Sequence, residues 1–211
     1  MARGKFITFE GGEGTGKSTQ IKHLAAYLSG LGIKSLTTRE VGGAPAAEEI
    51  REFWLHKEEG HWDPVCELLL IMAARREHLV RTIWPALEVG LWVISDRFVD
   101  SSRAYQGLTM GLGLPKVDGI YRQIADDFWP DLTLLFDMPA EEGLKRMKAR
   151  QGPDDRYQRQ KLSFHEKLRA SYLSLAEKEP KRFCILNAQQ DEASVAKNIS
   201  KAVAGHFGLP A

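Results

Sequence analysis

The sequence has only two cysteines in 211 residues, Cys66 and Cys184, and they show no paired spacing. A disulfide framework or a zinc site needs more cysteines at closer intervals, so both are excluded as organising features. The simpler interpretation is that both cysteines are small buried side chains. The sequence also lacks any apolar run that approaches the roughly 20 residues of a membrane-spanning helix.

An excess of charge of one sign is missing too. The formal net charge is +1, from 29 Lys and Arg against 28 Asp and Glu. A domain that coats nucleic acid or an acidic membrane carries a larger basic excess, and here basic residues gather only within 145–159. The first five residues lead into a strand-like segment without a signal-peptide core. We therefore expect a cytoplasmic protein that binds neither nucleic acid nor membrane.

Short apolar segments alternate with longer amphipathic ones along the chain. β-Branched and aromatic enrichment predicts strands at residues 5–10, 34–38, 91–95, 132–136 and 183–186. Helical spacing of apolar residues predicts helices at 18–31, 45–55, 64–86, 115–127, 139–150, 160–178 and 191–207. Asp63 before Pro64 is a good helix N-cap. This alternation is typical of an α/β fold with a parallel sheet flanked by helices, here as one domain over residues 1–211.

The first predicted strand ends in a glycine-rich turn that fits the pattern G-x-x-x-x-G-K-[ST]. Its glycines let backbone N–H groups face an anion without obstruction by side chains, and the following helix adds a favourable dipole. A lysine in this pattern reaches the β/γ-phosphates, and a hydroxyl binds Mg²⁺. The expected ATP-binding residues are Gly11, Gly12, Glu13, Gly14, Thr15, Gly16, Lys17, Ser18 and Thr19.

A phosphate-binding loop alone is shared by motors, switches, transporters and small-molecule kinases. No N-K-x-D segment, which a guanine-reading switch would need, is present. The strand at 91–95 is followed by Asp96 and Arg97, an acid next to an arginine, instead of the acidic pair of a motor. The acid can hold the water shell of a metal, and the arginine can face an anionic acceptor. We therefore predict a Mg·ATP-dependent phosphotransferase with Ser18 and Asp96 at the metal.

Three further segments carry a resemblance to a known family. They are Thr-Arg-Glu-Val-Gly-Gly at 38–43, Asp-Arg-Phe-Val-Asp-Ser-Ser at 96–102 with Ala-Tyr-Gln-Gly at 104–107, and Pro-Asp-Leu-Thr at 130–133. In this order they resemble the signature segments of thymidylate kinases over nearly the whole chain. The resemblance implies a P-loop nucleoside-monophosphate-kinase fold with a small helical lid at about 143–160. It also implies transfer of the ATP γ-phosphoryl group to dTMP, and a homodimer.

The resemblance assigns roles at matching positions. Arg97 and Arg51 would grip the dTMP phosphate, because guanidinium groups suit bidentate phosphate recognition. Arg75 would donate to the pyrimidine O4 and reject cytosine, and Tyr105 would pack under the deoxyribose. The full set of implied acceptor residues is Glu13, Arg39, Glu40, Arg51, Ile71, Arg75, Arg97, Ser102, Tyr105 and Gln106. For Arg39, a structural ion pair is an equal alternative.

In this family an arginine is supplied either by the phosphate-binding loop or by the lid. The variable loop positions 12–15 contain no arginine, so the resemblance implies that the lid supplies it. We expect Arg150 to act in catalysis with Lys17 and Arg97, and Arg156 and Arg146 to contact ATP. A solvated basic face is the alternative for this cluster.

The sequence departs from the family pattern in three places. Val41 stands where proline is usual and Ala44 where threonine is common. The family also stacks thymine on a phenylalanine about one helical turn before the arginine matching Arg75, but residues 70–75 contain no aromatic. Ile71 or Met72 could cover the base instead, or a tryptophan at 54 or 62 could compensate. A kinase for another, modified pyrimidine monophosphate therefore stays an alternative, as does a catalytically silent nucleotide-binding protein.

Overall fold

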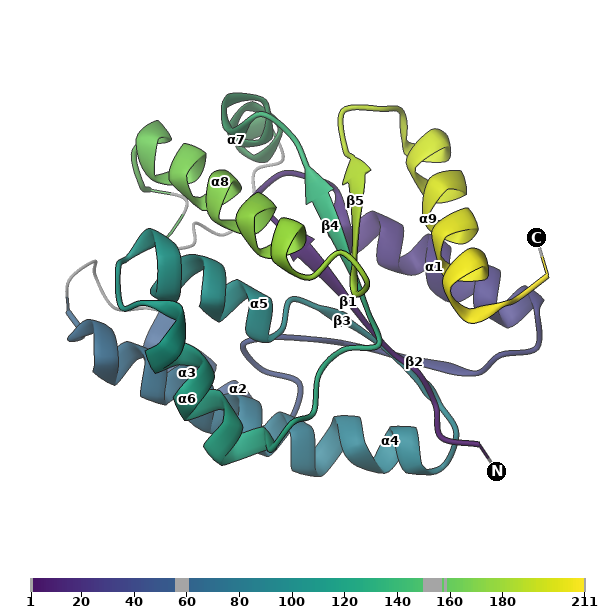
Figure 1. Ribbon diagram of the computed structural model, residues 1–211, viewed down its shortest axis with the longest axis horizontal. Helices are drawn as coiled ribbons and strands as arrows, with labels where there is room; N and C mark the ends of the chain where they lie inside the picture. The colour runs from purple at the N-terminus through teal and green to yellow at the C-terminus, as the bar shows by residue number, and fades with distance from the viewer. Residues whose placement is uncertain (1, 56–60, 150–156, 158, 211) are drawn as a thin grey trace.

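The protein is built on a five-stranded, all-parallel sheet with the strand order β2-β3-β1-β4-β5 (Figure 1). The structure, a computed structural model, describes residues 2–55, 61–149, 157 and 159–210. The strands are β1 (Phe6–Gly11), β2 (Ser35–Arg39), β3 (Trp92–Asp96), β4 (Leu132–Asp137) and β5 (Phe183–Asn187). The α/β class and the parallel sheet predicted from the sequence are confirmed.

Helices cover both faces of the sheet. Helices α1 and α9 lie on one face, and most of the others lie on the opposite face, with α7 near the carboxyl ends of the strands (Figure 1). The helices are α1 (Lys17–Gly30), α2 (Pro45–Leu55), α3 (Pro64–His78), α4 (Trp84–Glu88), α5 (Val99–Ser102), α6 (Leu114–Ala125), α7 (Ala140–Ala149), α8 (Leu162–Lys178) and α9 (Glu192–Phe207). Two π-helical segments, η1 (Leu79–Ile83) and η2 (Arg103–Thr109), interrupt the helical runs.

The central strand shows why both faces are apolar. Successive side chains of a strand point to opposite faces, so each face needs its own set of apolar residues. Ile7 and Phe9 of β1 pack in the core that α1 and α9 cover, whereas Phe6 packs with residues of α3, α4 and α6. All three side chains are fully buried. Helices therefore cover both faces of the sheet, and the carboxyl ends of its strands are where a site can form.

The predicted element positions agree with the structure to within a few residues, with informative exceptions. The predicted helix at 64–86 is one helical run that contains η1 and ends at Glu88, and Asp63 caps it by accepting bonds from Val65 N and Cys66 N. The sequence did not predict α5 and η2. The expectation that both cysteines are buried was wrong, because Cys66 is exposed and Cys184 is half-buried. No described helix combines the length and apolarity needed to cross a membrane.

Candidate active site

The glycine-rich turn lies at the carboxyl end of the central strand. β1 ends at Gly11, and α1 begins at Lys17 with Gly16 in the left-handed conformation (φ 89°). Gly11 and Gly14 also have positive φ values, 129° and 69°, which side chains rarely tolerate. The backbone therefore curls around a space at the N-terminus of α1, where the helix dipole favours an anion.

Lys17 is folded back into this turn. Its Nζ donates to the carbonyl oxygens of Gly11 at 3.1 Å and Gly12 at 2.8 Å, and it lies 3.4 Å from the Thr15 hydroxyl. Burial, followed by the charge of Arg97, lowers the pKa of Lys17 to about 8. A cation held this way gains a strong partner when a polyphosphate enters the turn.

Ser18 and Asp96 meet beside the turn. The Ser18 hydroxyl donates to Asp96 Oδ2 at 3.2 Å, so two oxygens that could coordinate a metal lie together although 78 residues separate them. Oxygen donors of this kind suit Mg²⁺, which keeps several waters and binds phosphate oxygens as well. The pair predicted from the sequence as metal ligands is thus brought together. Thr19, the next residue, lies exposed on the first turn of α1.

Helix α7 packs directly on the glycine-rich turn. A Cβ placed on Gly14 would lie 2.0 Å from the carbonyl oxygen of Gly143, and a Cβ on Gly143 would lie 2.5 Å from that of Glu13. Both distances are shorter than any real contact, so two backbones touch here only because both residues are glycines. Gly143 is the one buried residue of α7. The position of this helix is consequently set by the glycine-rich turn.

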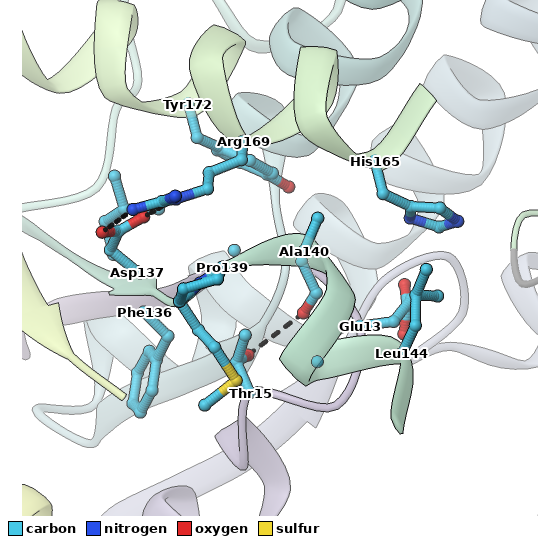
Figure 2. Close-up of a pocket in the computed structure, with 15 residues that line it drawn as sticks. Glu13, Thr15, Phe136, Asp137, Pro139, Ala140, Leu144, His165, Arg169 and Tyr172 are labelled. Atoms are coloured by element: carbon cyan, nitrogen blue, oxygen red, sulfur yellow. Dashed lines mark hydrogen bonds and ion pairs between the residues drawn. The ribbon is translucent and has the colours of Figure 1, made fainter. Parts of the chain in front are cut away.

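A narrow cavity lies beside this contact, between the turn, the start of α7 and one side of α8 (Figure 2). His165, Arg169 and Tyr172 of α8 face it (Figure 2). Arg169 donates two hydrogen bonds to Asp137 at the end of β4, at 2.7 and 2.8 Å. Sequence reasoning missed this bidentate pair, because its partners are 32 residues apart and belong to no local motif. It fastens α8 to the carboxyl edge of the sheet.

A second, larger pocket of about 170 Å³ opens on the other side of the turn. Glu13 lines both cavities, so the two are neighbours across the turn. The residues that line the larger pocket are Glu13, Arg39, Glu40, Val41, Arg51, Trp54, Ile71, Arg75, Asp96, Arg97, Phe98, Ser101, Ser102, Tyr105, Gln106 and Tyr157. Every implied acceptor residue is among them.

Arg97 lines the larger pocket and contacts Glu13, which lines both cavities. It follows β3 in the left-handed conformation (φ 70°), unusual for a residue with a side chain. Its guanidinium group contacts Gly11 O at 3.1 Å, pairs with Glu13 at 2.5 Å and lies over the Tyr105 ring. Burial raises and the charges of Arg97 and Lys17 lower the pKa of the Glu13 carboxyl, with a net downward shift. An anionic acceptor group would replace Glu13 as the partner of this arginine or share it.

A buried carboxylate holds the segment that follows Arg97. Glu10, at the end of β1, accepts hydrogen bonds from Phe98 N at 2.8 Å, the Ser101 hydroxyl at 2.6 Å and the Tyr172 hydroxyl at 3.1 Å. Burial, followed by the charge of Asp100, raises the pKa of Glu10 to about 7. This residue was not predicted from the sequence, since a strand-terminal glutamate carries no signal of its own.

Arg75 is fixed in a buried network at the floor of the larger pocket. Its Nε donates to Glu40 at 2.7 Å, and its two terminal nitrogens donate to Ser102 Oγ and to Phe98 O, each at 3.1 Å. The other oxygen of Glu40 lies 3.0 Å from His78 Nδ1. Glu40 therefore orients the guanidinium group of Arg75, and Ser102 accepts a hydrogen bond from one of its terminal nitrogens. This arrangement suits a guanidinium group that reads a carbonyl with little freedom to move.

Arg39, Arg51 and Gln106 also line the larger pocket. Arg51 donates to Val41 O at 2.7 Å, and Arg39 pairs with Glu48 at 2.9 Å. For Arg39 the structure thus shows an exposed ion pair together with a place in the pocket lining. Gln106 Nε2 donates to Glu67 at 3.0 Å and to the Tyr157 hydroxyl at 2.9 Å.

The basic cluster expected to contact ATP is only partly described. Arg146 lies on α7, where it pairs with Glu142 at 3.3 Å and donates to Ala188 O, just after β5, at 3.0 Å. It lines neither of the two cavities. Arg150 and Arg156 lie outside the described residues.

Comparison with known proteins agrees with this geometry. A thymidylate kinase family model matches residues 9–199. The thymidylate kinase of Magnetococcus marinus is 46% identical over 205 residues, which are 97% of this chain and 98% of that relative. The thymidylate kinase of Caulobacter vibrioides is 44% identical over 209 residues, 99% of this chain and 100% of that relative. The similarity thus spans the turn, both cavities and the whole sheet.

Proposed function

This chain belongs to the thymidylate kinase family, and we propose that its glycine-rich turn holds the phosphates of ATP and its larger pocket holds dTMP for transfer of the γ-phosphoryl group, giving dTDP. One observation carries the proposal most directly. The glycine-rich turn and the arginine-lined pocket share Glu13, and Arg97 contacts both Glu13 and the backbone of the turn. A phosphoryl group bound at the turn would therefore lie next to an anion bound at Arg97.

Catalysis in this arrangement is mainly electrostatic. The backbone amides of the turn and Lys17 stabilise charge on the transferring phosphoryl group, while Arg97 and Arg51 hold the acceptor phosphate in line. Ser18 and Asp96 would hold Mg²⁺ when it binds, and the metal would supply positive charge that stabilises the transferring phosphoryl group. Arg97 also offsets the repulsion between the two anionic substrates.

The lid supplies a further positive charge in this proposal. The turn itself contains no arginine at positions 12–15, and α7, which leads toward Arg150, packs on the turn through Gly143. Arg150→Ala should lower kcat by orders of magnitude while the KM for dTMP changes little. Arg81→Ala is the control, since that arginine is exposed and pairs with Glu77 of its own helical run. A rise in the KM for dTMP with an unchanged kcat would instead assign Arg150 to the acceptor.

Turnover of a panel of nucleoside monophosphates with Mg·ATP tests the proposed function. We expect dTMP to give the highest kcat/KM, above dUMP, dCMP and dGMP, with one ADP formed per dTDP. Faster turnover of AMP or GMP than of any thymine or uracil nucleotide would contradict the proposal. ATP binding without ADP formation for any acceptor would identify a catalytically silent protein.

We also propose that the enzyme acts in the cytoplasm as a homodimer. Phe53 of α2 and Leu69 of α3 support this, because both are about half exposed and lie on neighbouring helices. Light scattering after size exclusion tests the proposal, and Leu69→Glu should shift a dimer toward monomer. A monomeric mass for the wild-type protein would refute it.

A further inference from the structure

The lining of the larger pocket combines charged and apolar side chains. The charged ones include Arg39, Arg51, Arg97 and Asp96. The apolar part of the lining is formed by four side chains that belong to one hydrophobic cluster, each at most 8% exposed: Trp54, Ile71, Tyr105 and Tyr157. A nucleoside monophosphate combines a charged phosphate with a flat, largely apolar base. We therefore expect the base to lie against this apolar part of the lining.

Two helices contribute to the lining in the same way. α3 provides Ile71 and, one turn later, Arg75, whereas α2 provides Arg51 and, one turn later, Trp54. Residues three or four apart lie on one face of a helix, so each helix presents one apolar group and one arginine to the pocket. The difference is the kind of apolar group. On α3 it is aliphatic, and on α2 it is the largest aromatic side chain.

Trp54 is held in place by other rings. Its ring centroid lies 5.9 Å from that of Tyr157 at an interplanar angle of 52°, and Tyr157 in turn lies 4.7 Å from Tyr105. The Tyr157 hydroxyl donates to Glu67 at 2.6 Å and accepts from Gln106. A ring fixed by neighbours loses little freedom when a ligand covers it, so it offers a preorganised surface for stacking.

We propose that Trp54 is the residue whose ring covers the base of the acceptor nucleotide, so that α2 supplies the aromatic contact that α3 does not. The inference rests on the proposed function and adds a specificity-determining residue to it. Trp62, the other candidate for this role, is not among the residues that line the pocket; its ring packs against Phe53 at 5.0 Å. Stacking of a base on an aromatic ring raises affinity for the nucleotide by about tenfold or more.

Steady-state kinetics of Trp54→Leu test the proposal. We expect the KM for dTMP to rise about tenfold, with the KM for ATP and kcat within about twofold of wild type. Trp54→Phe should keep most of the affinity. Adding Ile71→Phe to Trp54→Leu should restore part of the affinity for dTMP, because α3 then supplies an aromatic ring to the apolar part of the lining. Trp62→Leu is the matched control and should leave both KM values unchanged.

Intrinsic fluorescence gives a second readout, which needs only a conservative substitution. Titration of the wild-type protein with dTMP should change tryptophan emission, and Trp54→Phe should remove that change while Trp62→Phe keeps it. An unchanged KM for dTMP in Trp54→Leu, or an emission change that persists in Trp54→Phe, would overturn the inference. Wild-type turnover of dTMP is measured first, so failure of the proposed function is seen separately.

Discussion

The two proposed substrate sites are built in different ways. The proposed donor site is a run of eight consecutive residues, 11–18, three of which have positive φ values, so that their backbone can face an anion. The lining of the proposed acceptor site comes from the glycine-rich turn, β2, α2, α3, β3, α5, η2 and the segment after α7. The proposed donor site is thus formed by one short segment of the sequence, whereas the proposed acceptor site forms only when distant segments fold together. Substitutions can test how far this contrast holds.

Loss of the arginine between the pockets should have the largest effect. Arg97→Ala removes the guanidinium group that contacts both Gly11 O and Glu13. We expect kcat/KM for dTMP to fall by about 10³-fold, in line with the loss of a main charge donor in other active sites. Arg81→Ala, on an exposed helix surface, should change it less than twofold. If Arg97→Ala affects only the KM for ATP, the arginine belongs to the donor pocket alone.

The buried carboxylate beneath that arginine should make stability depend on pH. Because the pKa of Glu10 is raised from 4.5 to about 7, the folded state binds more protons than the unfolded state between these values. The free energy of unfolding should therefore decrease as pH rises through this window, by at most about 3 kcal/mol. Urea unfolding at pH 5 and pH 8 measures the difference.

In Glu10→Gln this decrease should be absent. An equal decrease in the wild-type protein and the variant would assign the pH dependence to other groups.

The backbone contact between α7 and the donor turn should have a smaller effect, confined to turnover. Gly143→Ala places a methyl group within 2.5 Å of Glu13 O, so the helix must move away from the turn. We expect kcat to fall about tenfold, which is about 1.4 kcal/mol in barrier height, with little change in the KM for dTMP.

Gly205→Ala in α9 is the control, because nothing lies within 4 Å of its added methyl group. That variant should be as active as wild type and slightly more stable. Equal activity of both variants would show that the glycine contact does not position the lid helix.

The smallest effect concerns the proton on Lys17. With its pKa lowered to about 8, this lysine is partly neutral in the free enzyme at pH 8.5, and a bound polyphosphate favours its protonated form. ATP binding should therefore take up a fraction of a proton at pH 8.5 and almost none at pH 6.5. Calorimetry in buffers of different ionisation enthalpy measures this uptake, which should vanish in Lys17→Met.

Sequence reasoning succeeded where function is local. The turn at 11–18, the N-cap at Asp63 and the five strands follow from patterns a few residues long. The placement of the acceptor residues came from a family resemblance, and the lining of the pocket agrees with it. The pairing of Arg169 with Asp137 and the buried position of Glu10 left no sequence signal, because each depends on packing between distant elements. For the same reason only the fold shows that Trp54 lines the larger pocket and that Trp62 is not among its lining residues.

The order of the strands has a consequence for how this enzyme comes into being. β1 is the first strand synthesised, but its two neighbours in the sheet are β3, at Trp92–Asp96, and β4, at Leu132–Asp137. The glycine-rich turn at its end therefore has its complete platform only once the ribosome has added residue 137. We expect fragments that end before this residue to bind nucleotide more weakly than the whole chain, although they carry the complete motif.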